Sequence, residues 1–233
     1  MGRFLLFAAL AATLRGPASA TAQTTRTLKI VVPFQPGGGT DILARVVAEQ
    51  IGRMRPVSMI VENRPGAGTA IGTEAVARSA PDGNTLLLTT NSFVITPHFR
   101  KLGYDPVLSF EPICHLASSP WIIVVNSASP YRKLADLMNA ARNKPGDLTL
   151  AASGPGGGPH VAAEMLKRAA NVSMTYVPYP GGAPAVNALL GEHVTSVLTD
   201  YPTAMAQIKA GKLRTCHYPA GPRRSSPRCP DCR

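Results

Sequence analysis

The sequence predicts an α/β protein made of two lobes, on the basis of three observations. Strand-like apolar segments alternate with amphipathic helical segments along the chain. The alternation restarts after a polar, proline-containing stretch near residues 104–109, which places the boundary between the lobes within residues 103–120. Each half also carries one glycine-rich turn between a strand and a helix, PGGGT at 36–40 and GPGGG at 154–158. We therefore expect a first lobe over residues 23–110 and a second lobe over residues 111–213.

The first lobe is predicted to have the order βαβαβ. Its strands are expected at residues 28–33, 57–62 and 85–90, each an apolar run bounded by turn residues. Helices are expected at residues 41–54 and 71–80. The longer helix carries its large apolar residues at helical spacing, namely Leu43, Val46, Val47 and Ile51. This order favours a parallel sheet with helices on its faces.

The second lobe repeats the alternation over a longer stretch. Strands are expected at residues 121–125, 148–153, 174–179 and 194–199. Helices are expected at residues 133–142, 161–170, 181–191 and 202–213. Pro184 suits the first turn of a helix, where a missing backbone N–H removes no hydrogen bond. With 233 residues, the chain is long enough to bury a core in each lobe.

The two ends of the sequence differ from the body. Residues 1–22 combine a basic residue, the apolar run FLLFAALAATL and small residues, which predicts a signal peptide. Eleven apolar residues are too few for a membrane span. Residues 214–233 contain three cysteines, five arginines and four prolines but no branched aliphatic residue, so we expect no amphipathic helix and no buried strand there. The CxxC spacing of Cys229 and Cys232 lacks the context of a redox or zinc motif, and Cys114 is expected to be a small buried side chain.

The charge balance limits the kinds of binding partner that we expect. Lys and Arg number 24 against 13 Asp and Glu, which gives a formal net charge of +11. No stripe of basic residues with interleaved aromatics is present, so nucleic-acid binding is not expected. A mild positive balance over the body suits a small anionic ligand.

The glycine-rich turns are the candidate binding elements. Backbone N–H groups at a helix start, together with the helix dipole, favour an anion, and Thr40 is a candidate N-cap. The turn matches neither GxGxxG nor a phosphate loop, so a nucleotide is not favoured, although a tight turn without a ligand remains an alternative. His160 is expected to cap or pack at a helix start, because no oriented partner for catalysis is evident. No motif for an enzyme, metal or cofactor was found.

Seven stretches carry a family resemblance. They are IVVPFQPGGGTDILAR, VENRPGAGTAIGTEAVARSAPDGNTLLL, YDPVLSFEPI, KPGDL, SGPGGGPHVAAEML, VPYPGGAPAVNALLGEHV and IKAGKLR, and they cover about residues 28–214. In this order they resemble the Bug family, the substrate-binding receptors of tripartite tricarboxylate transporters. The resemblance implies a two-lobed periplasmic binding protein fold of type II character. It also implies a monomeric, non-enzymatic periplasmic receptor that binds a small organic carboxylate without a cofactor or metal and delivers it to the membrane components of its transporter.

The resemblance also implies a ligand site between the lobes. The first lobe would contribute Phe34, Gly37, Gly38, Gly39, Thr40, Thr90 and Asn91. The second lobe would contribute Gly154, Gly156, Gly157, His160, Tyr179, Gly181 and Asp200. Gly157 stands where the family usually has Thr or Ser, so a side-chain donor is missing at this position.

The resemblance stops at Arg214, and the arginine- and proline-rich segment that follows departs from the family pattern. We interpret it as the product of a frameshift, which would leave the first lobe incomplete. Three alternatives therefore stay open from sequence alone: a carboxylate receptor, an enzyme that holds an anionic substrate with its glycine-rich loops, and a truncated, non-functional receptor remnant.

Overall fold

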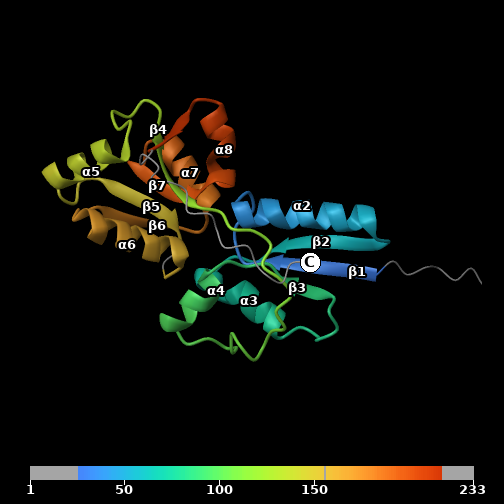
Figure 1. Cartoon of the computed structure of the whole chain (residues 1–233). Coiled ribbons are helices and arrows are strands. Elements are labelled where there is room, and N and C mark those ends of the chain that lie inside the picture. Colours follow the sequence, from blue (N-terminus) through green and yellow to red (C-terminus); the bar gives the residue numbers. More distant parts are fainter. Residues whose placement is uncertain (1–25, 155, 217–233) are drawn as a thin grey trace, which may run out of the picture.

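The computed structural model describes residues 26–154 and 156–216, which form two α/β lobes joined by an extended segment (Figure 1). The predicted two-lobed α/β class is confirmed. The predicted signal peptide, Cys229 and Cys232 lie outside the described residues.

The first lobe is built on a three-stranded parallel sheet in the order β2-β1-β3. Its elements are β1 (Arg26–Val32), α2 (Gly39–Met54), β2 (Val57–Asn63), the 3-10 helix η1 (Ala67–Thr69), α3 (Ala70–Ala77), β3 (Thr85–Leu87), α4 (Ser92–Ile95) and the 3-10 helix η2 (Thr96–His98). Helix α2 lies over one face of the sheet and α3 over the other (Figure 1). The βαβαβ order is as predicted, although β3 ends three residues earlier than expected, at Leu87.

The buried face of α2 differs from the predicted one. Ala44 and Ala48 are buried against Ile30 and Val32 of β1, whereas Val46 is 49% exposed. Val46 lies two residues from each alanine, which is about 200° around the helix, so it faces solvent when the alanines face the sheet. The expectation that Val46 belongs to the core face was wrong. The helix packs on the sheet through the small side chains of Ala44 and Ala48 instead.

The second lobe has a five-stranded sheet in the order β6-β5-β7-β4-β8. Its elements are β4 (Trp121–Asn126), α5 (Leu134–Asn143), β5 (Thr149–Ser153), α6 (Gly158–Ala170), β6 (Thr175–Tyr179), α7 (Gly182–Leu190), β7 (Ser196–Asp200), α8 (Tyr201–Lys209) and β8 (Leu213–Thr215). Strand β4 runs antiparallel to both β7 and β8, and the other pairs are parallel. Two core clusters pack on the sheet, one with Leu137 and Ala163 of α5 and α6, the other with Leu189 and Ala204 of α7 and α8.

Strand β8 corrects the expectation for the start of the C-terminal segment. Arg214 and Thr215 pair with β4, and the N–H of Cys216 donates to the carbonyl of Ile123 at 2.8 Å. Leu213 is 2% exposed and Cys216 is 8% exposed. The strand therefore extends two residues into the C-terminal segment, where Arg214 and Thr215 are half-buried. Backbone pairing with β4 is sufficient to form it without a branched aliphatic residue after Leu213.

The segment that joins the lobes is exposed. Residues 111–120 carry no helix or strand, and every one of them is exposed. Cys114 lies in this segment, so the expectation that it is buried was wrong. The physical reason is that, within the described part of the chain, no element packs over the segment, and Val107, Leu108 and Ile113 are likewise exposed.

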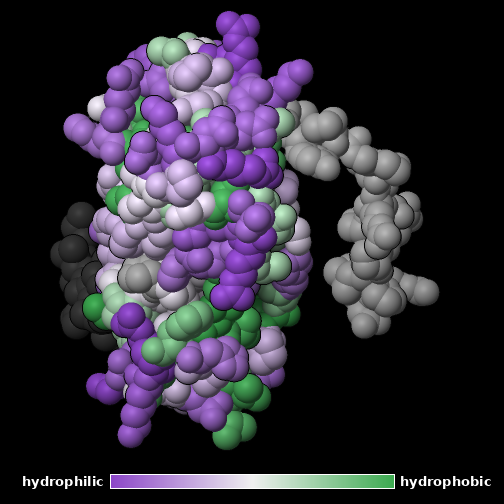
Figure 2. All heavy atoms as spheres, turned by 90° about the vertical axis from the view of Figure 1, so that its left-hand side faces the viewer, coloured by the Kyte–Doolittle hydropathy of each residue, from purple (hydrophilic) through white to green (hydrophobic). Residues whose placement is uncertain are grey.

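The outer surface is mixed in character. Viewed from the second lobe, hydrophilic side chains cover much of the molecule, and apolar ones gather mainly toward the lower edge (Figure 2). This pattern fits helices whose apolar faces are turned to the sheets. Among the described residues, no helix is both long enough and apolar enough to cross a membrane.

Candidate ligand site between the lobes

A cavity of about 350 Å³ lies between the two lobes. The first lobe lines it with Pro33 and Phe34 after β1, the loop at residues 66–69, and Ser92 and Arg100 around α4 and η2. The second lobe lines it with Ser153, Gly154 and Gly157 after β5, and with residues 178–180 at the end of β6. These segments sit at the carboxyl ends of parallel strands, which is where open α/β sheets bind ligands.

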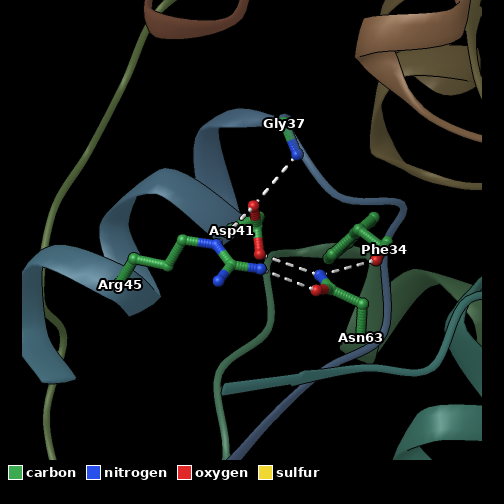
Figure 3. A network of polar contacts seen from close by, with 5 residues as sticks. All are labelled: Phe34, Gly37, Asp41, Arg45 and Asn63. Atoms are coloured by element: carbon green, nitrogen blue, oxygen red, sulfur yellow. Dashed lines mark hydrogen bonds and ion pairs between the residues drawn. The ribbon is translucent and has the colours of Figure 1, made fainter. Parts of the chain in front are cut away.

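The first glycine-rich loop is fixed by a buried carboxylate (Figure 3). Asp41 is 3% exposed, and its Oδ2 accepts hydrogen bonds from the N–H of Gly37 at 2.9 Å and from Nε of Arg45 at 3.0 Å. Its Oδ1 accepts from Nδ2 of Asn63 at 2.9 Å, and the same amide donates to the carbonyl of Phe34 at 3.2 Å. Asp41 thereby ties the loop to the end of β2.

The environment of Asp41 favours its charged form. Burial by itself raises the pKa of this carboxyl group, but hydrogen bonds from Arg45, Gly37 and Asn63 outweigh burial and hold the pKa below its ordinary value. Sequence reasoning missed this residue. The available signal was an acidic residue in the first helical turn after a glycine-rich loop.

Thr40 does not cap the helix as predicted. Helix α2 begins at Gly39, and Gly38 occupies the N-cap position with no side-chain cap. Thr40 is therefore the second residue of the helix, two residues after the N-cap position. Asp41, which follows it, accepts the loop N–H instead.

The first loop contacts the second lobe closely. The N–H of Gly39 donates to Oγ1 of Thr203 at 2.9 Å, and Oγ1 of Thr203 donates to Oδ1 of Asp200 at 2.6 Å. Asp200 also caps α8 by accepting the N–H of Thr203 at 2.9 Å. A Cβ at Gly39 would lie 2.6 Å from Oδ1 of Asp200, and a Cβ at Gly181 would lie 3.0 Å from Cβ of Gln35. Asp200 and Gly181 thus belong to an interlobe contact.

The second glycine-rich loop is held by two aromatic rings. The N–H of Gly156 donates to Nδ1 of His160 at 3.0 Å, and this ring stacks on Tyr176 with centroids 4.2 Å apart. The hydroxyl of Tyr176 donates to the carbonyl of Gly154 at 3.1 Å. Burial, with a smaller contribution from Glu164, raises the pKa of Tyr176 to about 12, so the phenol remains a donor at neutral pH. His160 packs at the start of α6, as the sequence predicted.

The second loop contacts the first lobe. The N–H of Gly158 donates to Oγ of Ser92 at 3.3 Å, and Ser92 is 2% exposed. A Cβ at Gly158 would lie 2.4 Å from Oδ1 of Asn91, and one at Gly156 would lie 3.5 Å from Cβ of Phe99. Each glycine-rich loop therefore has its own partner in the opposite lobe.

Four of the fourteen predicted site residues line the cavity: Phe34, Gly154, Gly157 and Tyr179. The other ten belong to the two loops or to the elements that contact or precede them: Gly37, Gly38, Gly39, Thr40, Thr90, Asn91, Gly156, His160, Gly181 and Asp200. That all fourteen contact a ligand stays a prediction.

Several lining residues were missed by sequence reasoning, notably Ser92, Arg100 and Thr69. Thr69 has φ of 85°, which is unusual for a β-branched residue, and its buried Oγ1 has no hydrogen-bond partner among the described residues. Ser92 and Arg100 stand in no glycine motif, whereas Thr69 directly follows Gly66-Ala67-Gly68, and this loop was the available signal. Within the described chain, no group of three or more His, Cys, Asp or Glu side chains could hold a metal ion.

Comparisons with known proteins agree with this geometry. The sequence matches the family described as "Tripartite tricarboxylate transporter family receptor" over residues 43–231, so the match continues past Arg214, where the resemblance was expected to stop. Protein BugT of Bordetella pertussis is 32% identical over 234 residues, covering 95% of this chain and 71% of BugT.

Two solved structures are similar in fold and sequence. The periplasmic binding protein BugD has a TM-score of 0.76 at 36% identity, over 82% of this chain and 64% of that chain. Rpa4515 of R. palustris, solved with adipate, has a TM-score of 0.79 at 32% identity, over 83% of this chain and 65% of that chain. The curated relatives are longer, and the chain spans 54% to 71% of their length.

Proposed function

This chain belongs to the tripartite tricarboxylate transporter receptor family, and from this premise we propose that it is a receptor for a small organic carboxylate. The ligand would bind in the cavity between the lobes. The observation that carries the proposal is the position of this cavity, which the carboxyl ends of parallel strands from both lobes line together.

Fewer backbone N–H groups are free to bind a ligand than the number of glycines in the two loops indicates. Several glycine N–H groups already have acceptors within the protein, those of Gly37, Gly39, Gly154, Gly156 and Gly158. In the described part of the chain, the N–H of Gly157 has none, and Gly157 lines the cavity at the start of α6. A helix start favours negative charge, so we assign the ligand carboxylate to this position.

Phe34 and Tyr179 would enclose the rest of the ligand. They lie on opposite lobes, and both line the cavity. A ligand that contacts both lobes binds the closed arrangement more tightly than an open one, and therefore shifts the population toward closure. Receptor action of this kind needs no chemical step.

The proposal extends to location and partners. A predicted signal peptide at residues 1–22 and the similarity to a protein described as a periplasmic binding protein support export to the periplasm. The family description supports delivery of the ligand to the membrane components of a tripartite tricarboxylate transporter. We propose that the chain acts as a monomer. We also propose that it is a receptor rather than an enzyme, and the description of its family as receptors supports this.

Thermal unfolding of the purified chain with added carboxylates tests the proposal. Adipate, succinate, citrate and glutamate form the panel, and uncharged 1,6-hexanediol is the control of matched length for adipate. A ligand that binds the folded state at 100 times its Kd stabilises it by about 2.7 kcal/mol, so a bound carboxylate should raise the unfolding temperature by several degrees. If the diol raises it as much as adipate, or if no carboxylate raises it, the proposal is wrong.

A further inference from the structure

Arg100 places a positive charge at the cavity, which the glycine-rich loops do not provide. Of the residues that line the cavity in the described chain, Arg100 alone carries a formal charge. The rest of the lining is formed by glycine, proline, alanine, Phe34, Tyr179 and hydroxyl residues. A second anionic group on a ligand would therefore find one complementary charge in this cavity.

The guanidinium of Arg100 is available for such a group. Arg100 is exposed and follows η2 by two residues. Among the described residues, none of the ion pairs within 4.0 Å involves Arg100, whereas Arg45, Arg53, Arg64 and Arg78 each pair with a carboxylate. A guanidinium presents planar paired donors that fit a carboxylate in two parallel hydrogen bonds.

The residue before Arg100 packs against the second glycine-rich loop. Phe99, which precedes it, lies 3.5 Å from the position of a Cβ on Gly156. Arg100 comes from the first lobe and Gly157 from the second, and both line the same cavity. A ligand with an anionic group at each end and an apolar spacer could therefore engage one group from each lobe.

We propose that Arg100 pairs with a second anionic group of the ligand and makes the receptor selective for dicarboxylates over monocarboxylates. This inference rests on the proposed function and identifies the ligand class and the residue that selects it. A monocarboxylate would leave the guanidinium unpaired, whereas a dicarboxylate would gain a charge-assisted pair in a partly enclosed space, where screening by solvent is weaker than on an open surface.

Calorimetric titration of the full chain with matched acids tests the inference. The dicarboxylates are succinate, glutarate and adipate, and the monocarboxylates are butyrate, pentanoate and hexanoate. The unaltered chain should bind the best dicarboxylate at least tenfold more tightly than the monocarboxylate of equal length. Arg100→Gln should weaken dicarboxylate binding about tenfold, which corresponds to about 1.4 kcal/mol, and should leave monocarboxylate binding unchanged.

Two control variants separate charge from structure. Arg100→Lys keeps the charge without the paired donors, so its affinity for the dicarboxylate should fall between those of the unaltered chain and Arg100→Gln. Lys101→Gln removes the neighbouring exposed charge, which does not line the cavity, and should change neither affinity. The unfolding temperatures of the free variants should match that of the unaltered chain, because Arg100 is exposed.

The following outcomes would each overturn the inference. Equal loss of both ligand classes in Arg100→Gln would mean that Arg100 does not distinguish the second group. If the unaltered chain prefers monocarboxylates, or if Lys101→Gln weakens binding as much as Arg100→Gln, the role of Arg100 is refuted while the proposed receptor function stands. If the unaltered chain binds no carboxylate of either class, the proposed function fails and the inference falls with it.

Discussion

The backbone N–H of Gly39 donates a hydrogen bond to Oγ1 of Thr203, which lies 164 residues further along the chain and in the other lobe. The same hydroxyl donates to Asp200, so an amide, a hydroxyl and a carboxylate form one continuous chain across the interlobe boundary. Next to the cavity, Gly158 donates a similar bond to Ser92 with the roles of the lobes exchanged. Two separate contacts thus hold the lobes together, and one of them, at Ser92, borders the proposed ligand site.

Gly39→Ala should open the lobes. The added Cβ would lie 2.6 Å from Oδ1 of Asp200. Rotating this carboxylate away would break its two hydrogen bonds from Thr203, so we expect the lobes to separate instead. Small-angle X-ray scattering should show a larger radius of gyration, and affinity for a bound carboxylate should fall about tenfold or more. Gly38→Ala is the matched control, because its Cβ would have no neighbour closer than 3.7 Å. Equal behaviour of the two variants would contradict the role assigned to Gly39.

Asp41→Asn should lower stability in a pH-dependent way. The pKa of Asp41 lies below its ordinary value of 3.8 in the folded protein, so its carboxylate stabilises the fold above that value, and the contribution is lost as pH falls toward the depressed pKa. The loss in free energy of unfolding should be about 1–3 kcal/mol at pH 7 and should shrink below pH 4.

Denaturant titration at several pH values measures this difference. Asp147→Asn is the control, because Asp147 is exposed and makes no ion pair among the described residues. A constant difference between the unaltered chain and Asp41→Asn from pH 3 to pH 7 would show that the charge of Asp41 does not contribute.

Two substitutions of His160 should separate its hydrogen bond from its stacking. His160→Asn places a side-chain oxygen near the position of Nδ1 and can still accept the N–H of Gly156, but it loses the stack on Tyr176. His160→Phe keeps the stack and loses the acceptor. We expect carboxylate affinity close to that of the unaltered chain in His160→Asn and several-fold weaker in His160→Phe, because the acceptor orients the loop next to Gly157.

The free energy of unfolding should rank the two variants in the opposite order, with His160→Asn less stable than His160→Phe. Loss of an aromatic pair lowers the free energy of unfolding by about 0.5–1.5 kcal/mol, so His160→Asn should be less stable than the unaltered chain by this amount. Calorimetric titration and denaturant unfolding of both variants provide the two readouts. If His160→Asn loses affinity and His160→Phe keeps it, stacking rather than the hydrogen bond positions the loop.

The two described cysteines should differ in reactivity. Cys114 is exposed, whereas Cys216 is buried, and burial raises the pKa of its thiol to about 11. The thiolate is the reactive form, so at pH 8 iodoacetamide should label Cys114 rapidly and Cys216 only after unfolding. Peptide mapping by mass spectrometry identifies the labelled residue. Rapid labelling of Cys216 in the folded chain would contradict its burial in the core of the second lobe.

The sequence predicted the fold well because apolar periodicity reports which segments face a core. The predicted orientation of α2 was wrong because the prediction gave weight to large apolar residues such as Val46, whereas the buried positions are alanines. The prediction also missed β8, where backbone pairing with β4 compensates for a polar sequence. Short edge strands depend on the neighbour that they join, and a local pattern does not contain that neighbour.

The site was only partly predictable, for a related reason. Glycine-rich turns are local features, so the two loops could be found from the sequence. Asn91 and Asp200 were named as site residues from the family resemblance, but their contacts with Gly158 and Gly39 follow only from the arrangement of the lobes. Arg100 stands in no motif, and its place in the cavity follows from the path of the chain after η2.

The exposed segment at residues 111–120 makes the two lobes a tethered pair. Within residues 26–154 and 156–216, the chain passes between the lobes once, along this segment. Ten extended residues reach at most about 36 Å, so each lobe meets the other at an effective concentration in the millimolar range. Closure is then an intramolecular association of the two lobes. A ligand that binds to both lobes acts as a bivalent linker between them. Its apparent affinity should depend on tether length even though the tether never touches it.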